Sequence, residues 1–332
     1  MENYTTIKRA DDGVRCLQIP FDAAGGRLDA VLAGLLPEYS RSRIQSWIRD
    51  GDVRLDGATA EVRTRVRGGE LVEMTVEPQP ASLPSLPEDI PLDVVYEDDS
   101  ILVIDKPAGL VVHPGSGNWQ GTLLNGLLHH APQLTHVPRA GIVHRLDKDT
   151  SGLMVVALTL QAQTSLVRQL QARTVRREYL AIVQGRVGQD GRVDAPIGRH
   201  ATQRTRMAVV SGGREAVTHY RVVTRFAAHT LVRCSLETGR THQIRVHMQH
   251  IGHPLVGDPV YHRRRTEPVG CARAFDRQAL HATQLGLLHP LTGEPMLWQR
   301  DPPADFVALL NCLATQEATG EARISQNNKN AG

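Results

Sequence analysis

The sequence predicts an α+β protein: a main domain with a mixed, largely antiparallel β-sheet flanked by helices follows a small N-terminal α/β domain. At 332 residues the chain is longer than one ordinary domain usually needs. Five prolines interrupt residues 78–91, PQPASLPSLPEDIP, and preclude regular structure there. Beyond them, segments with strand character follow one another, which favours antiparallel or mixed pairing. We therefore expect a domain over 15–77, a linker over 78–91 and a main domain over 92–312.

Both ends of the chain, residues 1–14 and 313–332, are predicted to be disordered because they are polar and lack periodicity. The N-terminus has no apolar core of the kind a signal peptide carries. No run of apolar residues is long enough to cross a membrane, which takes about eighteen residues or more. We expect a cytoplasmic protein without a membrane partner.

Residues 27–57 are predicted to form two short helices that turn into a strand, because two apolar stripes recur at helical spacing. Ser40 is the expected N-cap of the second helix, and Gly51 its C-terminal stop. Three arginines fall outside the second stripe and give the helix pair a basic face: Arg41, Arg43 and Arg49.

In the main domain, apolar patterning predicts strands at 94–96, 101–104, 141–144, 153–158, 178–184, 216–225 and 230–237. Helical periodicity predicts helices over 122–130 and 159–171, and a third that begins near Thr241. The candidate functional residues therefore lie in an α+β domain.

The densest group of reactive side chains is GIVHRLDKDTSGLMVVA, residues 141–157, interpreted as two apolar strands joined by the polar loop HRLDKDTS. Asp147 stands between Arg145 and Lys148 in sequence, and cations nearby favour the ionised form of a carboxylate. An ionised carboxylate suits nucleophilic or electrostatic work better than general acid catalysis. A purely structural salt bridge is the competing interpretation. Asp149, before TSG, is expected to stabilise the turn.

HRLDKDTSGLMVVA resembles, almost residue for residue, the motif that surrounds the catalytic aspartate of the RluA-type pseudouridine synthases. Two further motifs of that family follow in the expected order, RREYLAIVQG around Tyr179 and LETGRTHQIRVHMQHIGHPLVGDPVY around Arg245. The stretch VYEDDSILVIDKPAGLVVHPG also looks like the family, so the resemblance covers about residues 92–300. The helix pair, PEYSRSRIQSWIRDGDVRLDG, resembles the S4 RNA-binding domain that many members carry in front.

The resemblance implies an isomerase that converts specific uridines of large-subunit (23S) ribosomal RNA to pseudouridine after flipping the base. Asp147 would attack the sugar, attack the base or abstract a ribose proton, and all three routes need an ionised carboxylate. Arg245 would pair with Asp147 and hold its charge. Tyr179 would face the base, and Arg145 would fill the space that the flipped nucleotide leaves.

By the same resemblance, the S4-like domain would contact ribosomal RNA or the large ribosomal subunit through Arg41, Arg43 and Arg49. We expect a monomer. The reaction needs no redox change or energy input, and no glycine-rich phosphate loop is present, so neither a metal nor a nucleotide cofactor is expected.

Two hypotheses from other classes remain open. A ribosome-assembly factor would use the same folds only to bind RNA. A metal-dependent phosphodiesterase would use histidines and carboxylates, although the histidine intervals drift around a helix and no HExxH motif occurs. The histidines concerned are His242, His247, His250 and His253, which are otherwise expected to lie in the core or to contact RNA.

Overall fold

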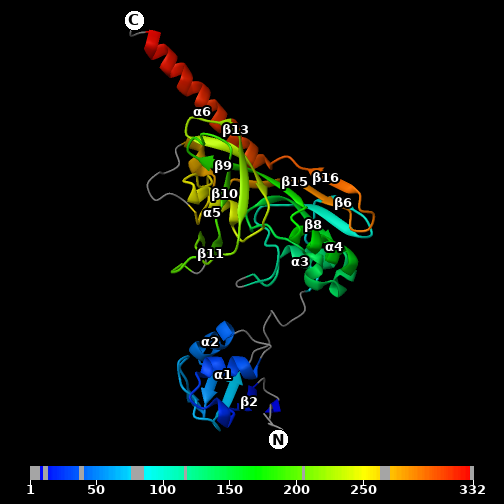
Figure 1. Cartoon of the computed structure of the whole chain (residues 1–332), viewed down its shortest axis with the longest axis vertical. Helices are drawn as coiled ribbons and strands as arrows, with labels where there is room; N and C mark the ends of the chain where they lie inside the picture. Colours follow the sequence, from blue (N-terminus) through cyan, green and yellow to red (C-terminus); the bar gives the residue numbers. More distant parts are fainter. Residues whose placement is uncertain are drawn as a thin grey trace. The chain divides into compact units, whose positions relative to one another are not determined.

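The structure is a computed structural model that describes residues 8–9, 14–36, 41–75, 86–115, 118–203, 206–261 and 270–329. The chain divides into two compact units, residues 1–84 and 85–332 (Figure 1). The division falls inside the proline-rich segment 78–91, of which residues 78–85 lie outside the described part. Each unit is described by itself.

The N-terminal unit is a five-stranded antiparallel sheet, in the order β1-β2-β5-β3-β4, with two α-helices. Its core contains Leu28, Leu32, Ile44, Trp47 and Ile48, so both predicted apolar stripes are buried. The expected cap Ser40 lies outside the described residues. The elements are β1 (Lys8–Arg9), β2 (Val14–Gln18), η1 (Phe21–Ala23), α1 (Leu28–Leu35), α2 (Arg41–Asp50), β3 (Val53–Leu55), β4 (Ala58–Thr59) and β5 (Leu71–Thr75).

The disorder predicted over 1–14 is wrong for Lys8, Arg9 and Val14. Lys8 pairs with Cys16 and Arg9 with Arg15, so β1 extends the edge of the sheet. A polar segment needs no apolar core of its own to do this, because the open edge of a sheet offers unpaired backbone N–H and C=O groups.

The C-terminal unit is built on a nine-stranded mixed sheet in the order β10-β13-β14-β9-β15-β8-β7-β6, with β16 also paired to β15. Of the strand pairs in this sheet that the structure describes, β15–β8 alone is parallel, which confirms the predicted sheet class. Its strands are β6 (Val94–Glu97), β7 (Ile101–Lys106), β8 (Ser151–Ala157), β9 (Arg176–Gln184), β10 (Gly191–Asp194), β13 (Val217–Arg225), β14 (His229–Leu236), β15 (Leu280–Leu288) and β16 (Pro295–Gln299); β11 (Ile197–Arg199) and β12 (Met207–Val209) form a separate pair.

Helices cover both faces of this sheet, which explains why β8 is apolar at nearly every position. Leu153 and Val155 of β8 belong to one core cluster, and Met154 and Val156 to another, as the period of two in a strand requires. The helices are α3 (Leu123–His130), α4 (Leu160–Gln171), α5 (Gln243–His250) and α6 (Ala304–Lys329), with 3-10 turns η2 (Pro132–His136), η3 (Pro138–Gly141) and η4 (Gly270–Ala274).

The first two of these helices begin where the sequence predicts. Thr122 and Asn125 form a capping box at the start of α3, and the Thr159 hydroxyl accepts a hydrogen bond from the Ala162 N–H at the start of α4. Among the described residues, no helix has the length and apolar character needed to span a membrane.

Two predictions for this unit need correction. Residues 141–144 form no strand: Arg139, Ala140 and Gly141 have positive φ angles of 54°, 48° and 74°, which bend the chain, and only Ile142 makes an isolated bridge. The tail 313–332 is not disordered through its described part, because α6 continues to Lys329 and Leu313 is buried in a core cluster with Phe306.

Candidate active site

Asp147 lies in the loop between η3 and β8, and backbone contacts fix the path of that loop. The buried Lys106 ammonium, at the end of β7, donates to the carbonyls of Pro107 (2.7 Å), Leu110 (2.9 Å) and Lys148 (2.9 Å). Burial lowers the pKa of Lys106 to about 7, although neighbouring carboxylates act in the opposite direction. Lys106 therefore anchors the residue that follows Asp147.

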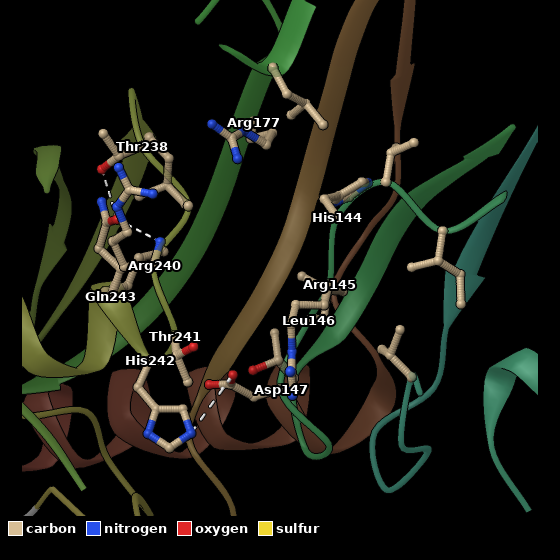
Figure 2. A pocket seen from close by; sticks show the side chains of 18 of the residues that line it. His144, Arg145, Leu146, Asp147, Arg177, Thr238, Arg240, Thr241, His242 and Gln243 are labelled. Carbon is tan, nitrogen blue, oxygen red and sulfur yellow. Dashed lines mark hydrogen bonds and ion pairs between the residues drawn. The ribbon is translucent and has the colours of Figure 1, made fainter. Parts of the chain in front are cut away.

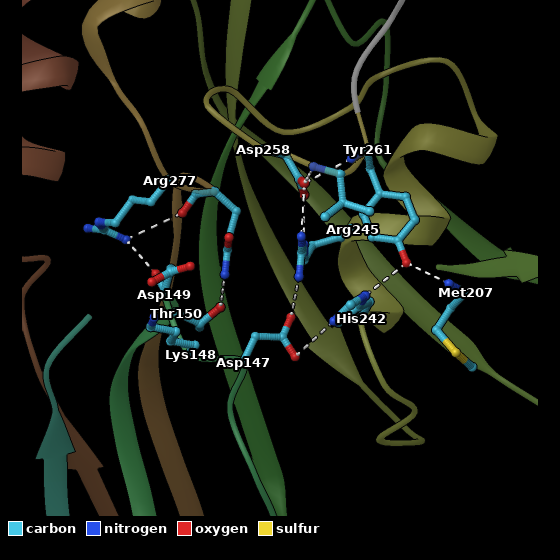
Figure 3. Close-up of polar contacts among 12 residues, drawn as sticks. Asp147, Lys148, Asp149, Thr150, Met207, His242, Arg245, Asp258, Tyr261 and Arg277 are labelled. Atoms are coloured by element: carbon cyan, nitrogen blue, oxygen red, sulfur yellow. Dashed lines mark hydrogen bonds and ion pairs between the residues drawn. The ribbon is translucent and has the colours of Figure 1, made fainter. Parts of the chain in front are cut away.

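The same loop is tied to the segment just before β15. Arg277 donates to the carbonyl of Asp149 (3.1 Å), and Gln278 donates to the Thr150 hydroxyl (3.1 Å) (Figure 3). The Thr150 N–H donates to the Asp147 carbonyl (3.1 Å) and closes the turn. These contacts hold the Asp147 backbone in place without using its carboxylate.

The Asp147 carboxylate is paired with Arg245 of α5. Arg245 Nη1 donates to Asp147 Oδ2 at 2.9 Å, while its Nε and Nη2 donate to the two oxygens of Asp258 at 2.7 and 2.9 Å (Figure 3). Asp258 is fully buried, and the Asp147 side chain is 17% exposed. Burial disfavours the guanidinium charge, but Asp258 and Asp147 outweigh it and raise the pKa of Arg245.

A cavity of about 1030 Å³ opens beside this pair, and Tyr179 and Arg245 line it. Asp147 and Arg145 line it too (Figure 2). Four predicted site residues from three distant segments therefore meet at one place. The Arg145 side chain is exposed, whereas Tyr179 on β9 is almost buried. Burial, reinforced by the charge of Asp147, raises the pKa of the Tyr179 hydroxyl, which keeps it protonated at neutral pH.

The cavity is rich in arginine, which suits a polyanionic substrate. Arg177 lies two residues before Tyr179 and therefore on the same face of β9. It is 7% exposed, and its Nε has no hydrogen-bond partner within the described part of the chain. The other arginines in the lining, besides Arg145 and Arg245, are Arg139, Arg173, Arg214 and Arg240.

The three arginines assigned to RNA binding by the sequence all lie on α2 of the N-terminal unit. Arg49 is exposed, and the side chain of Arg43 lies outside the described residues. Arg41 has an intramolecular partner that the sequence did not predict: its Nε donates at 2.9 Å to Asp29, a buried carboxylate that Arg27 also contacts. Part of the expected basic face is thus occupied by a structural ion pair.

Sequence reasoning missed Asp258, His242, Tyr261, Lys106 and Arg177. Asp258 and Tyr261 stand inside the quoted stretch HPLVGDPVY, but nothing local distinguishes a carboxylate that holds an arginine from one in a turn. His242 was considered as a metal ligand and, in preference, as a core or RNA-contacting histidine, but not as a neighbour of Asp147. Among the described residues, no three His, Cys, Asp or Glu side chains are arranged to hold a metal ion.

The mixed sheet carries a carboxylate–guanidinium pair beside an arginine-lined cavity, and two family models identify the class of protein as an RNA pseudouridine synthase preceded by an S4 domain. Residues 100–250 match the family model for RNA pseudouridylate synthase, and residues 26–72 match that for the S4 domain. The chain belongs to the RluA-type pseudouridine synthases, in the group named ribosomal large subunit pseudouridine synthase D.

Individual relatives match almost the whole chain. The synthase D of Nitrosomonas europaea is 57% identical over 314 residues, which cover 94% of this chain and 89% of the relative. That of Pseudomonas aeruginosa is 57% identical over 306 residues, 90% and 95% of the two chains. The solved structure of human RNA pseudouridylate synthase domain containing 4 is 28% identical with a TM-score of 0.54, covering 67% of this chain and 93% of that one.

Proposed function

We propose that this protein isomerises specific uridines of large-subunit (23S) ribosomal RNA to pseudouridine, in a reaction that depends on Asp147. One observation carries the proposal: the Asp147 carboxylate reaches an arginine-lined cavity while Arg245 holds one of its oxygens. The names of the relatives supply the large ribosomal subunit as substrate. The protein acts as a monomer in the cytoplasm, without a cofactor.

The reaction exchanges one bond for another. The bond between ribose C1′ and uracil N1 breaks, the base turns, and a bond forms between C1′ and C5, while a proton leaves C5 and N1 gains one. Asp147 starts this by attacking the sugar, attacking the base or taking a ribose proton. In each route Arg245 holds the carboxylate in one orientation.

The remaining cavity residues bind the flipped nucleotide. Tyr179 offers an aromatic face to the base, which serves an unpaired base well. Arg145, exposed at the cavity, enters the RNA stack that the nucleotide leaves, at an unstacking cost of a few kcal/mol. The S4 domain adds RNA affinity through its exposed arginines.

Incubating the purified protein with large-subunit ribosomal RNA, and mapping pseudouridine by carbodiimide treatment and primer extension, tests the proposal. Wild type should produce new stops, and should do so in EDTA. Asp147→Asn should lose product by about a thousandfold or more while binding RNA normally. Asp149→Asn, which changes the neighbouring carboxylate, is the matched control and should remain active. RNA binding without any new stops would favour the assembly-factor hypothesis instead.

A further inference from the structure

Met207, Tyr261 and His242 form a chain of polar contacts that ends beside the Asp147 carboxylate. The Met207 N–H donates to Tyr261 Oη at 2.8 Å, and Tyr261 Oη lies 2.8 Å from His242 Nδ1. The other ring nitrogen, His242 Nε2, lies 3.9 Å from Asp147 Oδ1 (Figure 3). Arg245 holds the opposite oxygen, Oδ2. His242 therefore faces the one carboxylate oxygen that Arg245 leaves open.

The hydrogen bonds of the Tyr261 hydroxyl determine which ring nitrogen of His242 carries a proton. Tyr261 is fully buried and has one hydroxyl hydrogen; its oxygen already accepts from Met207. His242 Nδ1 is the acceptor within reach of that hydrogen in the described structure. Burial lowers the pKa of His242, so the neutral ring predominates at neutral pH. With Nδ1 accepting, the proton of a neutral imidazole lies on Nε2, which faces Asp147.

The surroundings hold the His242 ring in this direction. His242 precedes α5 with φ 56° and ψ 23°, a left-handed conformation that is uncommon for a residue with a side chain. Its ring meets the Tyr261 ring edge to face at a centroid distance of 5.5 Å. The Arg245 guanidinium lies 5.0 Å from the Tyr261 ring centroid, so the same tyrosine contacts both groups that face Asp147.

We propose that His242 is a positioning residue for Asp147, an inference that rests on the proposed function. The Nε2–H of His242 donates a hydrogen bond to Asp147 Oδ1 once the target nucleotide fills the cavity. At 3.9 Å the contact is too long for a hydrogen bond, but catalytic hydrogen bonds often tighten only when substrate is bound. A carboxylate oxygen has two lone pairs, so one can take the histidine proton while the other faces the substrate. Tyr261 sets the tautomer that makes His242 a donor.

The experiment measures the single-turnover rate of pseudouridine formation at saturating enzyme, with RNA affinity measured separately by filter binding. His242→Ala should lower the rate by about ten- to a hundredfold, and leave the RNA dissociation constant within about twofold. His242→Gln can place an amide N–H near the position of Nε2, so it should recover at least about fivefold over the alanine variant. Tyr261→Phe should lower the rate by about three- to tenfold. The exposed His250→Ala, on the same helix, is the control.

An unchanged rate in His242→Ala, or a loss confined to RNA affinity, would overturn the proposal, as would a glutamine variant no faster than the alanine variant. If His242→Ala fails to fold, the comparison of His242→Gln with wild type decides: a loss beyond about twentyfold in a folded glutamine variant counts against a donor role. Failure of the proposed function itself would look different, because wild type would then form no pseudouridine at all.

Discussion

At the scale of single residues, Asp258 determines how Arg245 can act. Its two oxygens occupy Nε and Nη2 of the guanidinium, which leaves Nη1 to reach Asp147. Arg245 therefore approaches Asp147 from a fixed direction, because a planar guanidinium bound at two points to a buried carboxylate cannot swivel. A lysine at this position would offer charge without that geometry.

A second buried carboxylate, Asp29, gives a prediction about pH. Burial acts to raise the pKa of Asp29, but hydrogen bonds from Arg41, Gln45 and Arg27 outweigh it and hold the pKa below the ordinary value of 3.8. A carboxyl group whose pKa is depressed by folding contributes stability above its unfolded pKa, and loses it as the pH falls through the folded value. The contribution should be complete at neutral pH and decline below about pH 4.

Asp29→Asn should therefore lower the free energy of unfolding of the N-terminal unit by roughly 2 kcal/mol at pH 7. The loss is smaller than for a fully buried ion pair because the partners Arg27 and Arg41 are both half-exposed. Hydrogen exchange of the α1 and β5 amides in the full chain measures this. The difference from wild type should shrink as the pH falls below 4. Asp22→Asn, at an exposed carboxylate, is the control. A difference that does not depend on pH would contradict the charge argument.

At the scale of secondary structure, the parallel pairing of β8 with β15 explains why residue 152, in the TSG sequence, is a glycine. Gly152 pairs with Ala282, has φ 116°, and a Cβ there would lie 2.3 Å from the Ala282 carbonyl oxygen. The two strands can approach this closely only without a side chain. Because β8 begins four residues after Asp147, this pairing also sets where the loop that carries Asp147 ends.

Gly152→Ala should destabilise the C-terminal unit by about 3 kcal/mol or more, since neither backbone can yield without breaking the pairing. Thermal unfolding followed by circular dichroism measures the change. Gly188→Ala is the matched control, because its added methyl group meets nothing within 4 Å. Equal melting temperatures for the two variants would show that the strands can separate at Gly152 without cost.

At the scale of the whole molecule, the proposed function assigns RNA affinity to the N-terminal unit and the chemistry to the C-terminal unit. Removing residues 1–84 should leave a folded C-terminal unit, because its core clusters contain no residue of the first unit. RNA binding should become weaker and less dependent on salt, since fewer arginines displace counterions. The exposed arginines lost with the first unit include Arg49, Arg54, Arg63, Arg65 and Arg67.

The logarithm of the RNA association constant, plotted against the logarithm of salt concentration, gives the measurement. Its slope should become shallower by roughly 2, the effect of about three phosphate contacts at 0.7 each. Circular dichroism of the truncated chain controls for folding. The same slope in both proteins would mean that the N-terminal unit makes no ionic contact with RNA.

The sequence by itself determined the local structure and the chemistry available. Apolar periodicity predicted the buried faces of α1 and α2, the continuous apolar run of β8 indicated a strand, and the motif around Asp147 identified the candidate nucleophile. These features depend on neighbours within a few residues, and such patterns are visible in the chain itself.

Only the tertiary structure decided which side chains meet. Asp147 and Arg245 are 98 residues apart, and the tertiary fold, not any local pattern, brings them together with Asp258. The same holds for Arg41, whose expected RNA-facing side chain is bound to Asp29, and for Leu313, whose burial keeps the expected tail within a helix. Packing across the whole fold determines which side chains contact one another, and a single sequence does not contain the distances between its residues.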